Sequence, residues 1–184
     1  MKRNLLGKVR IIELMKSDLS LPKLNYHYIA TSFFDMPIVQ GTKSWKIELI
    51  QNPLEKPLEK SFTGNFFEEH IEEPRAFATV LNDNQVGWIE VGYEKWNNRM
   101  RVWEFLVKDE FRRMGIGTLM MDYAVKVAKE KGARMLVLET QSCNVAAIAF
   151  YLKQGFTLIG FDSAAYSNTD IEKKEVRIEM GLTL

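Results

Sequence analysis

The sequence is poor in the residues that build disulfides and metal sites. It has one cysteine, Cys143, and two histidines, His27 and His70, which lie far apart along the chain. A single cysteine excludes a disulfide within the chain and is typical of a reducing compartment. One cysteine and two distant histidines also lack the spacing of a metal-binding motif. We therefore predict a protein without a metal cofactor.

The sequence also lacks an excess of charge of either sign and any long apolar stretch. Its 25 lysines and arginines nearly balance its 24 aspartates and glutamates, which gives a net charge of +1. No basic surface is therefore expected for binding nucleic acid or an anionic membrane. No run approaches the roughly 20 apolar residues of a membrane span, and Met1–Arg10 lacks the apolar centre of a signal peptide. We predict a cytoplasmic protein with neither nucleic-acid nor membrane partners.

What remains is the composition of one globular domain. The chain has 184 residues, of which 46% are hydrophobic and 27% are charged, and this is enough for one substantial core. The pattern is irregular up to residue 74. Pro53 and Pro57 and the repeated Pro-Leu-Glu-Lys predict a loop. The elements expected in this part are strands at Val9–Leu14 and Trp45–Ile50, a short helix at Leu24–Phe34, a loop at Asn52–Lys60 and one helical turn at Phe66–Ile71.

From Arg75 onward the pattern becomes regular and predicts a mixed α/β sheet. Two strands joined by the turn residues Asn82-Asp83-Asn84 form a hairpin, and a turn at Gly92–Met100 follows. Strands and helices then alternate, which is typical of α/β architecture. The expected strands are Arg75–Leu81, Gln85–Val91, Arg101–Lys108, Met135–Glu139, Phe156–Phe161 and Glu175–Leu182, and the expected helices are Met114–Lys131 and Asn144–Gln154.

The segment between the third of these strands and the first helix is suited to binding phosphate. It reads Arg112-Arg113-Met114-Gly115-Ile116-Gly117. A helix N-terminus offers unpaired backbone N–H groups and partial positive charge, which a phosphate satisfies. Glycines allow the backbone to approach closely, and arginines add cationic donors. On spacing alone, a glycine-containing turn before an ordinary helix is an equal alternative.

Two other phosphate-binding loops do not fit this segment. A P-loop requires a lysine before the Ser or Thr that follows its last glycine, and Gly117-Thr118 has none. A dinucleotide-binding fingerprint requires a third glycine at the position of Met120.

Two motifs together resemble the GNAT superfamily of N-acetyltransferases. The first is Arg112-x-x-Gly115-x-Gly117 between a strand and an amphipathic helix. The second, about 30 residues later, is Asn144-x-x-Ala147-x-x-Phe150-Tyr151-x-Lys153-x-Gly155-Phe156. The resemblance covers roughly residues 75–184. It implies an acyl-CoA N-acyltransferase fold, with a mostly antiparallel, twisted sheet flanked by helices, and acetyl-CoA as the acetyl donor.

The resemblance also assigns residues to the donor. In the family, the strand before the loop pairs with the pantetheine arm by a form of strand addition, and a backbone N–H near Leu106 or Val107 stabilises the oxyanion. Asn144 either contacts the donor or only caps its helix. The residues expected to bind acetyl-CoA are Leu106, Val107, Arg112, Arg113, Met114, Gly115, Ile116, Gly117, Thr118, Asn144, Ala147, Phe150 and Tyr151.

Two residues are expected to move protons. A lysine-like amine has a pKa of about 10.4, so a base helps supply its neutral form. Glu104 lies where the family often places a catalytic carboxylate, and strand alternation predicts that it shares a face with Val102 and Leu106. Alternatively, Glu104 binds the cationic acceptor or pairs across the sheet. Tyr151 is the family's usual general acid for the leaving thiolate, and its alternative is a core aromatic beside Phe150.

A narrower resemblance concerns the acceptor. The segments Leu138–Gln141 and Ile159–Asp162, Tyr166-Ser167-Asn168 and Trp96-Asn97 are similar to the streptothricin acetyltransferase branch. That branch usually has Glu-Asp where this chain has Glu104-Phe105, and residues 1–74, the expected acceptor side of the single domain, have no match. Glu139, Asp162 and Tyr166 are candidate acceptor contacts or ordinary structural groups. The expected partner is a small cationic amine. A peptide acceptor, a non-catalytic acetyl-CoA-binding module and a homodimer are further hypotheses.

Overall fold

The computed structural model describes residues 9–184. Met1–Arg10, which is predicted not to be a signal peptide, therefore lies mostly outside the described residues. The chain divides into two compact, interleaved units. The first comprises the described part of Met1–Tyr26 together with Thr63–Leu138 and Gly181–Leu184, and the second comprises His27–Phe62 and Glu139–Met180. Four strands, β2, β5, β9 and β11, pass from one unit into the other. The prediction of a single domain over residues 1–184 stays a prediction.

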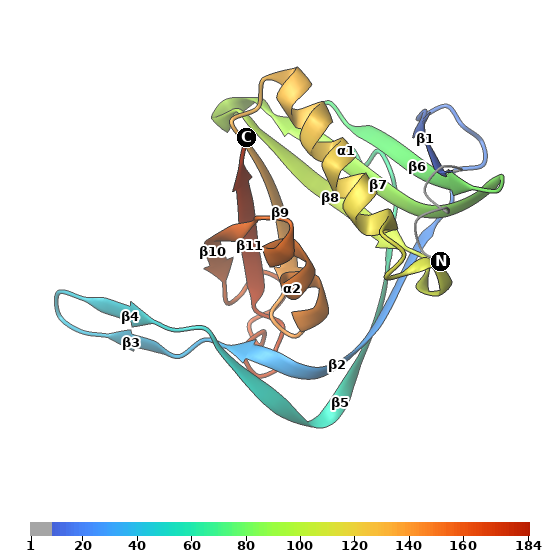
Figure 1. Ribbon diagram of the computed structural model, residues 1–184. Helices are drawn as coiled ribbons and strands as arrows, with labels where there is room; N and C mark the ends of the chain where they lie inside the picture. The colour runs from blue at the N-terminus through green and yellow to red at the C-terminus, as the bar shows by residue number, and fades with distance from the viewer. Residues whose placement is uncertain (1–8) are drawn as a thin grey trace. The chain divides into compact units, whose positions relative to one another are not determined.

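The first unit is a sheet with a helix on one face (Figure 1). Its strands follow the order β1-β6-β7-β8-β9, and the pairing is antiparallel except between β8 and β9, which are parallel. Short 3₁₀ turns, η2 (Lys95–Asn97) and η3 (Asp109–Phe111), flank β8. The bounds are β1 Val9–Leu14, β6 Arg75–Leu81, β7 Asn84–Glu94, β8 Arg99–Val107, α1 Ile116–Lys131 and β9 Met135–Gln141.

The two faces of this sheet pack against different partners. On one face Phe77 of β6 contacts Tyr123 of α1, with ring centroids 5.0 Å apart. Ile89 lies opposite Phe77, and Phe105 lies opposite Ile89, so all three side chains share the α1 face. The other face packs against the N-terminal segments and the segment before β6. Its buried apolar cluster consists of Leu14, Leu24, Phe67, Ala76, Ala78 and Trp88.

The second unit contains the ends of the interrupted strands, one helix and a long ribbon. The ribbon is formed by β2 (Leu24–Asp35) and β5 (Ile50–Gly64), and the hairpin of β3 (Ile38–Gln40) and β4 (Trp45–Ile47) connects them. In Figure 1 this hairpin continues outward from the ribbon. The helix α2 (Val145–Lys153) follows β9, and β11 (Arg177–Thr183) lies between β9 and β10 (Thr157–Asp162) in the strand order.

The segment Leu24–Phe34, predicted as a helix, is a strand, so that prediction is wrong. Its burial alternates, with Leu24, Tyr26 and Tyr28 turned inward and the residues between them exposed. Alternation of this kind is the period of a strand, and tyrosine and β-branched residues favour strands. The alternation of apolar and polar residues in this segment predicts a strand and is the stronger signal.

The segment Asn52–Lys60, predicted as a loop, belongs to β5, so that prediction is also wrong. In a two-stranded ribbon each strand has one open edge, where a proline loses no hydrogen bond of the ladder. Pro53 and Pro57 are four residues apart, so their nitrogens face the same edge. The side-chain contacts His27–Glu59 and Ser32–Gln51 show that β2 and β5 run antiparallel.

Most other predicted elements are confirmed, with ends that shift by at most three residues. The predicted strand Trp45–Ile50 ends at Ile47, and Ile50 already begins β5. The segment Phe66–Ile71 forms bends and turns in place of a helical turn. Asn82 and Asp83 have positive φ angles of 49° and 62°, which suit a two-residue type I′ hairpin turn.

A β-bulge corrects the predicted alternation along β8. Glu104 lies opposite Glu90, but Val102 lies opposite Val91, so Trp103 is an extra residue without a partner on β7. Because Glu90 and Val91 point to opposite faces, Glu104 and Val102 also do. The prediction that they share a face is therefore wrong. The bulge instead places Trp103 and Glu104 together on the face away from α1.

Candidate functional site

The loop before α1 has the backbone of an anion-binding turn. Arg113 and Gly115 have positive φ angles of 60° and 89°, and glycine adopts this conformation without the penalty that a Cβ brings. Gly115 is the N-cap of α1, and no side chain accepts a hydrogen bond there. The helix therefore begins without a side-chain cap at its first turn, which contains the N–H groups of Ile116, Gly117 and Thr118.

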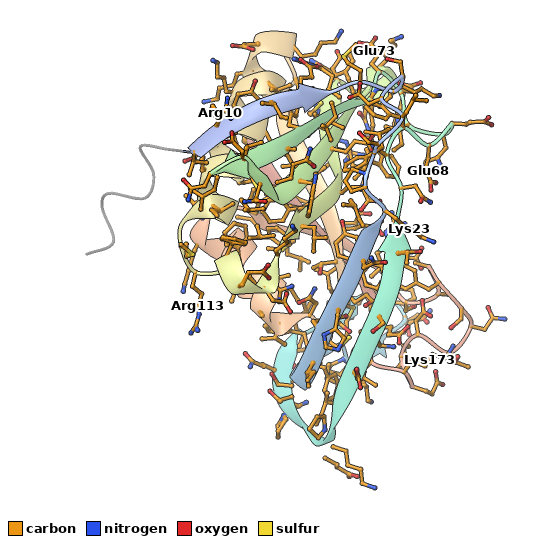
Figure 2. All side chains as sticks on the ribbon, turned by 90° about the vertical axis from the view of Figure 1, so that its right-hand side faces the viewer. Arg10, Lys23, Glu68, Glu73, Arg113 and Lys173 are labelled. Carbon is orange, nitrogen blue, oxygen red and sulfur yellow. The ribbon has the colours of Figure 1, made fainter. Side chains whose placement is uncertain are left out.

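The two arginines of the loop differ in their contacts. Arg112 is held: its Nε donates to the carbonyl of Val107 at 3.3 Å, and its guanidinium pairs with Asp109 at 2.8 Å. Arg113 is exposed and has no ion-pair partner among residues 9–184. Figure 2 shows its side chain extending away from the ribbon. Arg112 thus ties the loop to β8, while Arg113 offers an uncommitted cation beside Met114 and Gly115.

The direction of the backbone groups of β8 separates the two predicted oxyanion donors. The N–H of Lys108 donates to the carbonyl of Val86 on β7, so it points toward the β7 edge of β8. The N–H of Phe105 points to the other edge, where it donates to the Tyr26 hydroxyl at 3.2 Å. Backbone N–H groups alternate between the two edges along a strand. Val107 therefore presents its N–H to the edge away from β7, whereas the N–H of Leu106 faces β7.

Glu104 is held by a tyrosine from the N-terminal half of the chain. The Tyr26 hydroxyl donates to Glu104 Oε2 while accepting the N–H of Phe105. Burial raises the pKa of Glu104, Tyr26 lowers it through this hydrogen bond, and the charge of Glu68 raises it. Gly64 lies against the same carboxylate, where any larger side chain would displace it. Glu104 is thus a half-buried, oriented carboxylate with a raised affinity for protons, as a general base requires.

A second carboxylate lies opposite the first. Glu90 is fully buried on β7. Its Oε1 accepts the N–H of Phe67 at 2.7 Å, and Phe67 has a positive φ of 59°. Burial raises the pKa of Glu90 to about 7, and the charges of Glu104 and Glu68 add to that effect. We call Glu68, Glu90 and Glu104 the carboxylate cluster.

The segment before β6 completes the surroundings of the carboxylate cluster. Glu68 is exposed, and its carboxylate lies 3.5 Å from Nδ1 of His70. Figure 2 shows Glu68 on the segment that joins β5 to β6. The His70 ring packs edge-on against Trp103 at 4.9 Å. An aromatic wall and three acidic side chains thus lie together on the face of the sheet away from α1, a combination suited to an organic cation.

In the second unit, Tyr151 of α2 lies in an aromatic environment. It is 7% exposed and packs against Phe150 and Phe156, with ring centroids 5.5 and 6.0 Å away. Burial raises the pKa of its phenol. Tyr151 therefore keeps its proton at neutral pH and has one to donate. The packing fits the alternative of a core aromatic beside Phe150, and the role of general acid stays a prediction.

The start of α2 is capped as the sequence predicts. The Asn144 side-chain oxygen accepts the N–H of Ala147 at 3.3 Å. This hydrogen bond accounts for Asn144 as an N-cap. A contact between Asn144 and acetyl-CoA stays a prediction. Ala147 and Phe150, also predicted to contact acetyl-CoA, are half-buried on the same helix.

The three predicted acceptor contacts of the second unit do not form one group. Tyr166 donates to Glu139 at 3.3 Å, and Arg177 pairs with the other oxygen of Glu139 at 2.9 Å. Arg177 also pairs with Glu179. Asp162 instead accepts the N–H of Ala164 at 2.9 Å and so stabilises its own turn. The charge of Glu139 is compensated by Arg177.

Sequence reasoning missed several polar residues around these groups. Tyr26 escaped notice because its segment was expected to be a helix. The same expectation hid Tyr28, which donates to Gln141 Oε1 at 2.5 Å and lies 3.4 Å from Cys143 Sγ. The period of two over Leu24–Ala30 is the signal that could have found both. Glu90 had a weaker signal, a single acid in the apolar run Val86–Val91.

Residues 9–184 contain no group of three or more His, Cys, Asp and Glu side chains placed to hold a metal ion. No helix within the same residues is both long and apolar enough to cross a bilayer.

Comparison with known proteins relates the whole arrangement to acetyl transfer. Residues 42–156 match the acetyltransferase (GNAT) family. A streptothricin acetyltransferase from Streptomyces lavendulae is 35% identical over 128 residues, which span 65% of this chain and 68% of the other.

Two solved structures share the fold along nearly the full length. The crystal structure of a nourseothricin acetyltransferase has a TM-score of 0.76 at 27% identity, covering 96% of this chain and 98% of the other. A structure from Bacillus anthracis str. Ames, described as a streptothricin acetyltransferase in complex with acetyl coenzyme A, has a TM-score of 0.73 at 26% identity, covering 96% and 97%. The predicted fold, a mostly antiparallel mixed sheet with flanking helices, is confirmed.

Proposed function

This chain belongs to the acetyltransferase (GNAT) family, and we propose that it transfers an acetyl group from acetyl-CoA to an amine of a streptothricin-like antibiotic. The predicted family, enzyme class and acetyl donor are confirmed by the family match and by the related structure that contains acetyl coenzyme A. The names of the relatives support the choice of acceptor.

The observation that carries the acceptor class is the carboxylate cluster. Glu90 and Glu104 lie opposite each other on β7 and β8, and Glu68 adds a third carboxyl group. No ion pair joins Glu90 or Glu104 to a lysine or arginine within residues 9–184. Acidic groups without such partners favour a cationic ligand. The phenylalanine at position 105 points toward α1, so the loss of an acid there leaves the acidic face intact.

Glu104 is proposed as the general base. Its carboxylate accepts a proton from the acceptor ammonium, and the resulting neutral amine attacks the thioester carbonyl. The raised pKa of Glu104 supports this role, because a base is most effective when its pKa is near the working pH. The N–H of Val107, which faces the edge away from β7, is the proposed donor to the oxyanion.

Tyr151 is proposed as the general acid that protonates the departing thiolate. Its buried phenol is protonated at neutral pH, and its proton neutralises the charge left on sulfur when the C–S bond breaks. The proton that the acceptor nitrogen loses as the amide forms then restores the phenol through solvent. The loop Arg112–Thr118 is proposed to bind the phosphates of acetyl-CoA through its backbone N–H groups and Arg113.

The test is an acetylation assay with a free-thiol readout. Purified protein is mixed with acetyl-CoA and a streptothricin, an aminoglycoside, a polyamine or a peptide with a free N-terminus. Thiol release with the streptothricin supports the proposal, and Tyr151→Phe is expected to slow it by about tenfold or more, the scale of general acid catalysis. Turnover with the peptide alone would reassign the acceptor. Binding of acetyl-CoA without turnover on any amine would indicate a non-catalytic module.

We also propose a homodimer in the cytoplasm. The β3–β4 hairpin supports pairing of two copies, because Val39 and Trp45 are 62% and 63% exposed on it and an isolated two-stranded hairpin is marginally stable in water. Sedimentation of the wild type and of Trp45→Ser tests this: one species of monomer mass in both would exclude the dimer. Cell fractionation tests the location.

A further inference from the structure

Glu90 and Glu104 are a like-charged pair placed directly across two strands. They are partners in the antiparallel register of β7 and β8, on the face away from α1. Side chains directly opposite each other in such a pair have Cβ atoms about 4.5–5.5 Å apart, and like charges there are destabilising. Two full negative charges on such a pair repel each other, and binding of a proton or a cation relieves the repulsion.

One oxygen of this pair has no partner. Glu90 is 0% exposed, and its Oε2 makes no hydrogen bond within residues 9–184, although its Oε1 accepts the N–H of Phe67. An unpaired carboxylate oxygen away from water is costly unless it carries a proton. A protonated Oε2 would be a donor and would remove the charge.

No lysine or arginine within residues 9–184 forms an ion pair with Glu90. The acidic and other titratable groups around Glu90 are Glu104 on β8, Glu68 and His70 on the segment before β6, and Tyr26 on β2. Two cations share this face of the sheet: Arg101 pairs with Glu94 and lies over the Trp103 ring, and Lys108 lies over the Trp88 ring. His70 lies against Glu68 and Trp103, and the Tyr26 hydroxyl donates to Glu104. Burial and these acidic neighbours raise the pKa of Glu90 to about 7.

We propose that Glu90 and Glu104 hold one proton between them while the acceptor is absent, and that the ammonium group of the acceptor replaces this proton when it binds. The inference rests on the proposed function, because it takes the acceptor to be a cation bound at Glu104. Glu90 acts here as a positioning and specificity-determining residue: it does not touch the reacting atoms but sets the charge next to the base.

The protons balance in two steps. Binding exchanges the proton of the carboxyl pair for the acceptor ammonium, and that proton leaves to solvent. Glu104 then accepts a proton from the bound ammonium and produces the neutral amine, while the ionised Glu90 beside it increases the proton affinity of Glu104. A neutral acceptor cannot replace the proton, so the pair selects for cationic amines.

The first test needs no acceptor. The side-chain carboxyl signals of ¹³C-glutamate-labelled protein are followed by NMR from pH 4 to pH 9, and Glu90→Gln assigns the signal of Glu90. We expect a titration midpoint near 7 for Glu90, and a lower midpoint in Glu104→Gln, where the neighbouring charge is gone. A midpoint near the ordinary glutamate value of about 4.3 would overturn the proposal.

The second test measures protons released by the acceptor. A streptothricin is titrated calorimetrically at pH 7 in two buffers of different ionisation enthalpy. Wild type is expected to release protons on binding, up to one per acceptor, in proportion to the share of molecules whose carboxyl pair is protonated at that pH. Glu90→Gln, which keeps an oxygen for the Phe67 N–H, should lose this release and show a raised KM with kcat less affected.

The matched control is a substitution that removes a charge outside the carboxylate cluster. Glu130→Gln removes one charge from an exposed position of α1 and should release as much as wild type. Equal release from Glu90→Gln and wild type would overturn the inference even if the streptothricin is acetylated. A wild type that neither binds nor acetylates the streptothricin would contradict the proposed function, and the carboxyl titration would still show whether the pair holds a proton.

Discussion

The two faces of the β7–β8 pair are made of neighbouring residues but serve different purposes. Toward α1, Ile89 and Phe105 lie in register with Phe77, whose ring packs against Tyr123 of α1. Away from α1, Glu90 and Glu104 lie opposite each other, beside Phe67 and Trp103. The face toward α1 buries apolar side chains. The other keeps charge, an unpaired oxygen and a positive φ angle, features that are costly for stability and typical of functional sites.

The comparison shows why stability and activity should be separable in this unit. Side chains of the α1 face contribute by excluding water, so their loss weakens folding. On the other face, Trp88 belongs to a buried apolar cluster, but the carboxylates Glu90 and Glu104 do not stabilise the fold, so their loss should weaken chemistry more than folding. Three substitutions test this separation, in order of decreasing expected effect.

The largest effect is expected from Glu104→Gln. The amide still accepts the Tyr26 hydroxyl but does not take a proton, so kcat/KM should fall by about 10²–10⁴. The melting temperature should stay close to that of wild type. Steady-state kinetics over pH 6–9 and thermal unfolding measure both. For wild type, kcat/KM should rise with pH as Glu104 ionises, and this limb should vanish in the variant. Retention of more than a tenth of the activity would exclude Glu104 as the base.

The opposite outcome is expected from Phe77→Ala. Phe77 is 1% exposed and packs on Tyr123, so truncation should lower the free energy of unfolding by about 3–5 kcal/mol. At a temperature where the variant is still folded, its kcat/KM should be within a few-fold of wild type. Urea unfolding and kinetics on the same sample check this, and a large loss of kcat with little loss of stability would refute the division of the two faces.

A smaller effect should appear in the pH dependence of stability. The pKa of Glu90 is about 7 in the folded chain against an ordinary value of 4.5, so the folded state binds this proton more tightly than the unfolded state. Stability should therefore fall as pH rises from about 4.5 to 7, by up to roughly 3 kcal/mol. Glu90→Gln should abolish this part of the slope. Urea unfolding of both proteins at pH 5 and pH 8 measures it, and parallel slopes would contradict the expectation.

Sequence reasoning was most successful where one local pattern determines one structure. The period of the α1 residues, the glycines of the loop at 112–117 and the capping residue Asn144 depend on neighbours within a few positions, and each predicted element is present. The ribbon of β2 and β5 depends on pairing between segments about 30 residues apart, and prolines and mixed composition obscured it. The β8 bulge depends on a register that only the partner strand reveals.

The same limit applies to the site. Glu104 and Tyr151 could be proposed because they lie in or near motifs. Tyr26, Gly64 and Glu90 could not, because each becomes relevant only through a contact with a residue that is distant in sequence. Glu90 also appears in the sequence as an acid within an apolar run, where its partner across the sheet is invisible.

The extra residue in β8 suggests how such a surface could be modified over evolutionary time. A substitution in a regular strand replaces one side chain of a face by another. An inserted residue accommodated as a bulge adds a side chain to one face and leaves the spacing of the other face unchanged. Trp103 is such an addition: Val102 and Phe105 keep their places toward α1, while the face away from α1 gains an indole next to Glu104. Insertions and deletions at this position are therefore a route to new acceptors that does not require the core to be rebuilt.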